Sequence, residues 1–213
     1  MYSPNPRWLL CLVLAVAVPA VAAAELEVEA RTVDGQVLVD VRAPLLFDDD
    51  LERSLRSGLP ARVRLVVELW NERTGLWDHF VLDHRSEIRV LYDVLDARYD
   101  VFDGGGVLLA STSERAEAAR WVEEVDGLPL CAVEALHPDD RYYVSAEIRL
   151  QPMTVEEVRD LERWLRGSLE GGDGRGSVLG RVSRQLFGVL KGRVGLGDRG
   201  LRGRSGDFGA TED

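Results

Sequence analysis

The sequence predicts a mainly β fold, an antiparallel β-sandwich of the immunoglobulin-like kind with short peripheral helices. Two observations lead to this prediction. Apolar and polar residues alternate over much of the stretch 25–167, which is the pattern of strands with one buried face. The runs are short, and tight turns such as Asp34-Gly35 separate them, which favours an antiparallel sandwich over a parallel sheet with crossover helices. An α+β sheet with helices on one face is the alternative.

The predicted strands follow in order along this β-rich globular domain, residues 25–167. Leu26, Val28 and Ala30 alternate with charged residues, and the Asp-Gly step joins them to a second alternating run as a hairpin. The clearest alternation of the chain lies at 142–151. The other expected strands are 37–41, 61–69, 76–82, 88–92, 98–102 and 107–110, with the triple glycine 104–106 as a turn.

Three short helices are expected between and after these strands. Phe47, Leu51 and Leu55 recur every four residues, behind the three aspartates 48–50 that suit a helix N-terminus. A capping box at 111–114 predicts a second helix that ends at Gly127, and one at 154–157 predicts a third that ends at Gly167.

The first 24 residues have the order of an export signal. Arg7 precedes an apolar run, Pro19 breaks that run, and small residues follow up to Ala24. The apolar stretch is also just long enough for an uncleaved N-terminal anchor, which is the alternative. We therefore expect an exported protein, in the periplasm or on the extracellular face of the cytoplasmic membrane. Cys131 then remains as the one cysteine, and its apolar neighbours predict a buried, unreactive thiol.

Residues 168–213 are predicted to form a Gly/Arg-rich tail. Between 175 and 204 the chain has eight basic residues and one acidic residue, although its net charge is -11. Apolar and basic side chains on opposite sides predict an amphipathic helix at 177–194. The tail would contact an anionic lipid surface or an acidic partner, or it would dock on the acidic body or stay disordered. The contact residues expected are Arg181, Arg184, Lys191, Leu186, Phe187 and Leu190.

The composition excludes several classes of function. With 37 acidic and 26 basic residues the chain lacks the basic surface that nucleic acids need, so no nucleic-acid partner is expected. Three histidines and two cysteines leave little for a zinc site. No cofactor is predicted.

Two histidines with neighbouring carboxylates are the first candidates for chemistry. His79 and His84, with Asp78, could bind a metal or act as acid and base in a hydrolase. Five residues along a straight strand place the two imidazoles on opposite faces, so only a bend could join them. We therefore predict no metal site and no catalytic residues.

Other polar clusters are predicted to be structural. His137–Asp140 is typical of a turn, and Asp48–Asp50 lack the spacing of a calcium loop. No serine lies in a nucleophile elbow. The sequence thus indicates a protein that is not an enzyme.

Four aromatic residues could form a binding surface for a glycan or another small ligand. Trp70, Trp77, Tyr92 and Tyr99 are interpreted instead as core residues, because aromatic side chains fill sandwich cores. Trp70 is the exception, since alternation places it on the polar face of its strand with Arg62 and Arg64.

The middle of the chain, from about Val39 to Gly167, resembles a family of exported bacterial proteins, domain of unknown function 4390. The order and spacing of several short motifs carry this resemblance: Leu55–Pro60, Val67–Trp70, Trp77-Asp78, Val90–Asp93, Tyr99–Val101, Arg141–Val144, Thr154–Val158 and Trp164-Leu165.

The resemblance implies an envelope protein without an established activity. It also implies a partner class, because genes of this family lie beside those of membrane sensor kinases in some bacteria. The leading hypothesis is a non-enzymatic module that binds an envelope protein or assists signalling.

Overall fold

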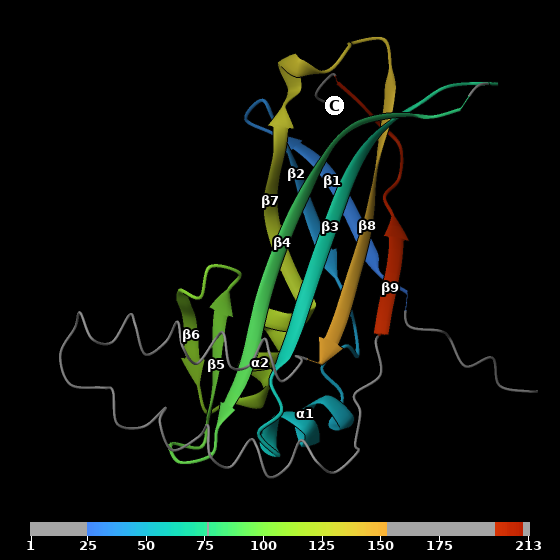
Figure 1. Ribbon diagram of the computed structural model, residues 1–213. Coiled ribbons are helices and arrows are strands. Elements are labelled where there is room, and N and C mark those ends of the chain that lie inside the picture. The colour runs from blue at the N-terminus through green and yellow to red at the C-terminus, as the bar shows by residue number, and fades with distance from the viewer. Residues whose placement is uncertain (1–24, 76, 153–198, 211–213) are drawn as a thin grey trace, which may run out of the picture.

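Two antiparallel sheets face each other in the computed structural model, which describes residues 25–75, 77–152 and 199–210 (Figure 1). The small sheet has the order β1 (Glu27–Val33), β2 (Gln36–Arg42), β7 (Glu124–Ala132). The large sheet has the order β10 (Phe208–Gly209), β8 (Arg141–Pro152), β3 (Ala61–Glu72), β4 (His79–Asp93), β5 (Arg98–Asp103), β6 (Leu108–Thr112), and β9 (Arg199–Arg204) also pairs with β8. The predicted mainly β sandwich is confirmed.

The core lies between the sheets and follows the alternation of the sequence. The odd-numbered residues of β3 are buried, and the even-numbered residues of its neighbour β8 are buried opposite them. From the small sheet, Val37, Val39 and Val41 are at most 1% exposed. Fully burying one such side chain contributes about 1.5–3 kcal/mol, so this shared core holds the two sheets together.

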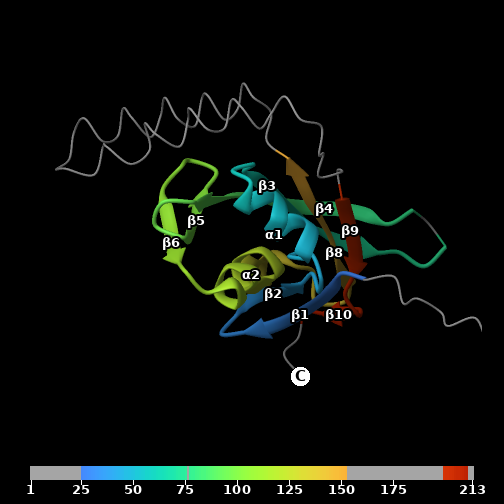
Figure 2. The same cartoon turned by 90° about the horizontal axis from the view of Figure 1, so that it is seen from below.

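The helices α1 (Asp49–Arg56) and α2 (Arg115–Glu123) close the lower end of the sandwich (Figure 2). Asp48 caps α1, since its carboxylate accepts a hydrogen bond of 2.8 Å from the Leu51 amide. Leu51 and Leu55 are fully buried, as predicted. A single-turn helix, η1 (Val133–Ala135), follows β7.

The predicted end of the second helix at Gly127 is wrong. α2 ends at Glu123, and β7 begins at once because Glu124 and Val125 pair with Arg42 and Val41 of β2. The capping box expected at 111–114 is also wrong, because the N-cap residue of α2 is Glu114, which makes no side-chain capping bond, and Ser111 donates to Asp100 instead. The Thr112 hydroxyl accepts from the Glu114 amide at 3.0 Å and donates to Glu117 at 2.7 Å, which holds the chain just before the helix.

Other segments differ from the prediction because pairing with a neighbouring strand determines where a strand begins and ends. The two strands expected at 76–82 and 88–92 are one long strand, β4, paired along almost all of β3. β7 was not expected at all, and Cys131 lies on it only partly buried, with its thiol pKa raised by that burial. The helix predicted after 154 lies outside the described residues.

Part of the segment predicted as a tail belongs to the sandwich. β9 pairs with β8 over six residues, and Arg199 forms an ion pair with Asp48 at the cap of α1. At Gly203 the strand β1 crosses so closely that a Cβ would lie 2.0 Å from the carbonyl oxygen of Leu26. Only a residue without a side chain fits there, so this glycine allows the contact between β9 and the small sheet.

Candidate partner-binding surface

The hairpin of β3 and β4 extends beyond the body of the sandwich, and a β-bulge sets its side chains near the tip (Figure 1). Leu69 pairs with Leu82 and Trp70 pairs with Phe80, which leaves Val81 as an extra residue. A bulge of this kind turns the following side chains to the other face. Trp70 and Phe80 therefore share the outer face, where their rings meet edge to face with centroids 5.6 Å apart.

Tyr143 joins this pair from the neighbouring strand β8, where it lies opposite Trp70. Its hydroxyl donates a hydrogen bond of 2.9 Å to Asp78, and the Arg204 guanidinium lies 3.6 Å from its ring centroid. Burial and the bond to Asp78 raise the pKa of Tyr143, so the hydroxyl stays protonated as a donor. The tip is thus tied to both β8 and β9.

Trp77 stands at the end of this hairpin and is 94% exposed, and Phe80 is 44% exposed. We call Trp70, Trp77, Phe80 and Tyr143 the hairpin aromatic patch. Large aromatic side chains left in water lose the gain of burial, and they supply the greatest binding energy when a partner covers them. The patch is therefore the candidate functional site.

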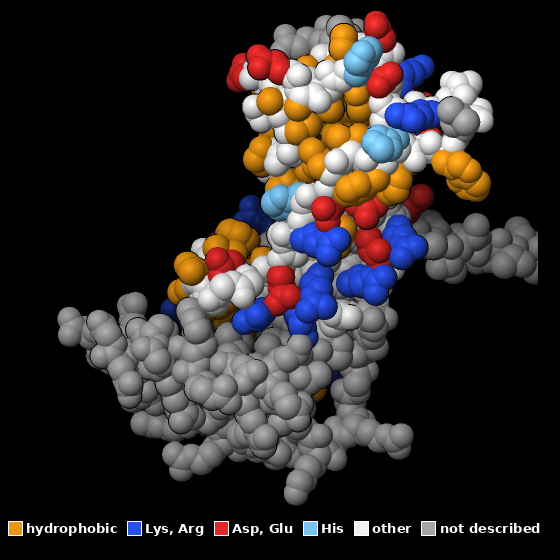
Figure 3. Space-filling view, turned by 45° about the horizontal axis from the view of Figure 1, so that its top comes forward, with side chains coloured by type: hydrophobic (Ala, Val, Ile, Leu, Met, Phe, Trp, Pro, Cys, Tyr) orange, Lys and Arg blue, Asp and Glu red, His pale blue; other side chains and the backbone are white. Residues whose placement is uncertain are grey.

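A band of ion pairs covers the outer face of the large sheet beside the patch, and Figure 3 shows arginine and acidic side chains gathered next to apolar ones. Glu87 accepts from Arg64 at 2.9 Å and from Arg89 at 3.1 Å. Partly exposed ion pairs of this kind contribute little stability, but they favour a partner of matching charge. The Trp70 indole donates to Glu68 at 3.1 Å, which links the patch to the band.

A hollow in this band is lined by Val66, Glu68, Ser145, Glu147 and Arg202. Arg202 and Glu147 form an ion pair of 3.1 Å across it. The hydrogen bonds from Arg149 and Arg202 lower the pKa of Glu147, although its partial burial opposes them. Both carboxylates of the hollow are therefore held by neighbouring donors, Glu147 by two arginines and Glu68 by the Trp70 indole.

The chain matches the family model described as Domain of unknown function (DUF4390) over residues 23–155. The chain belongs to this family. The DUF4390 match covers every strand from β1 to β8, including the hairpin aromatic patch, whereas β9 and β10 lie beyond it. Comparison with curated proteins and with solved structures gives no match.

The predicted opposite placement of His79 and His84 in this DUF4390 chain is wrong. His79 lies opposite Asn71 and His84 opposite Val67, so the bulge puts both imidazoles on one face. They are four β3 positions apart, however, or about 13 Å at about 3.3 Å per residue, which is too far for one metal ion. Asp78 is engaged by Tyr143 instead. In the described part of the chain, no three metal-binding side chains gather.

The interpretation of the aromatic residues as core holds for two of the four. Tyr99 is fully buried and donates to Glu52 at 3.0 Å, and Tyr92 packs against it with centroids 4.9 Å apart. Trp77 is the opposite case, and Trp70 lies on the outer face as its alternation indicated. Hairpin tips carry no alternation, so periodicity could not reveal the exposure of Trp77.

The polar clusters that were predicted to be structural lie in turns or at a helix start of the DUF4390 fold. Residues 138–139 and 104–105 are turns, and Asp48–Asp50 lie at the start of α1. The residues predicted for lipid or partner contact, Arg181, Arg184, Lys191, Leu186, Phe187 and Leu190, lie outside the described residues, as does the stretch 1–24. No helix among the described residues is long and apolar enough to cross a membrane.

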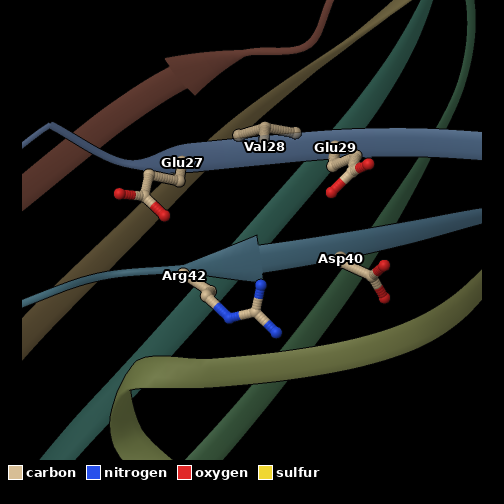
Figure 4. A pocket seen from close by; sticks show the side chains of 5 residues that line it. All are labelled: Glu27, Val28, Glu29, Asp40 and Arg42. Carbon is tan, nitrogen blue, oxygen red and sulfur yellow. The ribbon is translucent and has the colours of Figure 1, made fainter.

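A second hollow lies on the outer face of the small sheet, lined by Glu27, Val28, Glu29, Asp40 and Arg42 (Figure 4). Its carboxylates do not converge on one point. The hydrogen bond from Arg31, at 2.9 Å, outweighs burial and lowers the pKa of Asp40, which also accepts from the Gly127 amide. Arg42 is paired with Asp126. These groups stabilise the sheet surface and form no catalytic arrangement.

Proposed function

We propose that this DUF4390 protein is a non-enzymatic binding module of the cell envelope, and that the hairpin aromatic patch holds a protein partner. One observation carries the proposal: Trp77 is 94% exposed at the end of a hairpin that reaches beyond the body. The export signal in the sequence supports the envelope location. A membrane sensor kinase is the partner class that the family resemblance favours.

The patch has the chemistry of a protein contact site. Tryptophan, tyrosine and arginine are the residues most enriched among those that dominate binding energy. In the free protein Trp70 already packs against Phe80, and Tyr143 already contacts Arg204 and Asp78. Binding to an arranged surface costs less conformational entropy, which supports tight contact through a small area.

The alternative hydrolase function loses its support. It needs His79, His84 and Asp78 to act together, but the imidazoles lie far apart along β4 and Asp78 accepts from Tyr143. A general base must also lie within about 3 Å of the group whose proton it takes, so imidazoles this far apart cannot serve one reacting group together.

The hypothesis that the basic segment 175–204 contacts lipid is less well supported at the C-terminal end of that segment. Arg199, Arg202 and Arg204 supply three of its eight positive charges, and each is paired with an acid of the sandwich. Docking on the protein's own body therefore explains this end of the segment. The central residues, Arg181 to Lys191, remain the proposed contact with an anionic surface.

The test is affinity capture of the tagged full chain from its native envelope, with chemical crosslinking and mass spectrometry. The Trp77→Ala variant should recover the main partner about 30-fold less well, because truncating a residue of this kind costs about 2 kcal/mol. Leu95→Ala is the matched control, since Leu95 is an exposed apolar residue, at 56%, on the turn after β4. Equal recovery from wild type and Trp77→Ala would refute the proposal.

A further inference from the structure

The four edges of the two sheets differ in how they are protected against pairing with another strand. Each sheet ends in strands whose main chain can pair with another strand, and proteins normally block such edges with charge or proline. The small sheet ends at β1 and β7, and the large sheet ends at β6 on one side and at β9 and β10 on the other.

Three of these edges carry the usual protection. β1 has Glu27, Glu29 and Arg31, and β7 has Pro129 together with acidic residues at its start. β9 has three arginines, and β10 is only two residues long. A foreign strand would meet charged side chains or a missing amide at each of them.

β6 has none of this protection. Residues 104–113 contain no charged residue and no proline, in a chain that is 30% charged. Val107, Leu108 and Leu109 are 59%, 53% and 41% exposed, so three successive apolar side chains meet water here. Within the described ranges no strand pairs with the outer side of β6, which ends the large sheet away from the hairpin aromatic patch (Figure 1).

We propose that β6 pairs antiparallel with β6 of a second copy of this chain, so that two large sheets join across a two-fold axis. In such a pair every residue faces a residue of the same strand, and a charged edge would therefore repel itself. β6 is the edge that escapes this repulsion. Its small residues Ala110 and Ser111 allow close approach, while Leu108 and Leu109 gain burial.

The joined pair would change how the proposed partner is held. Each copy keeps its hairpin aromatic patch free at the far side, so the dimer presents two patches on one continuous sheet. Two linked sites bind a two-fold or clustered membrane partner with a higher overall affinity than one site does. The dimer itself does not depend on that partner, and its test is separate.

The test is the mass of the full chain in solution, kept in mild detergent and followed by sedimentation over a concentration series. Wild type should be a dimer, and Leu108→Lys should weaken it at least about tenfold, because it replaces an apolar side chain of the joined edge with a charge that the second copy would remove from water. Leu95→Lys is the control, because Leu95 is as exposed as Leu108 but lies on a turn outside the edge.

A second measurement distinguishes other occupants of the edge. With Cys11 and Cys131 changed to serine, Ala110→Cys should form an intermolecular disulfide, whereas Leu95→Cys should not. A wild type that stays monomeric overturns the proposal. If that monomer also exchanges its β6 amides slowly with deuterium, another part of its own chain covers the edge in place of a second copy.

Discussion

The two ends of the sandwich differ in the burial of their aromatic residues. At the helix end, Tyr99 is buried and donates to Glu52, which also accepts from Arg56 at 2.8 Å. At the hairpin end, Trp77 is 94% exposed and buries almost none of its side chain in the free protein. The first end is closed, since its polar and aromatic groups stabilise one another. The hairpin end leaves a large aromatic side chain exposed. We therefore assign a role in stability to the helix end and a role in binding to the hairpin end.

The largest effect on stability is expected at Gly203, where β9 packs against the small sheet between the two ends. Gly203→Ala should be severely destabilising, by more than about 4 kcal/mol, because its Cβ would overlap the Leu26 backbone and separate β9 from β1. Thermal or urea unfolding of the purified chain measures this. Gly206→Ala is the control, since a Cβ there has nothing within 4 Å, and it should change stability little. Equal stability of the two variants would show that β9 does not pack as described.

The next effect is expected at Leu51, which anchors α1 in the core. Leu51→Ala should lower the free energy of unfolding by about 2–5 kcal/mol, because it leaves a cavity under a fully buried side chain. Leu95→Ala, on an exposed turn, should cost less than about 0.5 kcal/mol. Urea unfolding at neutral pH compares them, and a Leu51→Ala variant as stable as the control would contradict the position of α1.

This end was largely predictable from the sequence, because local signals decide it. The four-residue spacing of Phe47, Leu51 and Leu55 and the three aspartates mark α1 without knowledge of the fold. Elsewhere in the sandwich, the turn at 138–139 and the alternation of 142–151 were equally local signals. What such signals miss is Arg199, which reaches the cap of α1 from 151 residues away.

The hairpin end was predicted less well, for the same reason. Its chemistry depends on a bulge between β3 and β4, and a bulge is defined by two strands rather than by one. The straight-strand assumption therefore misplaced His79 relative to His84. Tyr143 and Arg204 entered no predicted site, because they meet only through the pairing of β8 with β9 and with β3.

Acid should weaken the closed end by protonating two of its carboxylates, Asp48 and Glu52. Burial alone would raise the pKa of Asp48, but bonds from the Leu51 amide and Arg199 outweigh it, so its pKa is lowered in the fold. Stability from a lowered pKa is fully present above the unfolded value of about 3.8 and is lost as pH falls through the folded value. Glu52 behaves in the same way, through Arg56 and Tyr99.

Asp48→Asn isolates this contribution, because asparagine caps a helix as well as aspartate does. We expect a loss of about 1 kcal/mol at neutral pH, since the pair with Arg199 is about one-third exposed and partly screened. The variant should also lose less stability than wild type between pH 4 and pH 2. Asp50→Asn, at an exposed pair with Arg53, is the control and should match wild type at both pH values. Identical acid curves for Asp48→Asn and wild type would contradict the role of Arg199.

The smallest effect on stability is expected at the hairpin end, where it separates the two roles most clearly. Trp77→Ala should change the free energy of unfolding by less than about 0.5 kcal/mol, because the side chain buries almost nothing in the free protein. Tyr143→Phe should cost about 1 kcal/mol by removing the hydrogen bond to Asp78. Urea unfolding of both variants gives these values, and circular dichroism confirms that both keep the fold. A Trp77→Ala variant that loses partner recovery without losing stability would show that the hairpin is exposed for binding. A clear loss of stability would mean that Trp77 packs on the protein, and that the two ends do not differ.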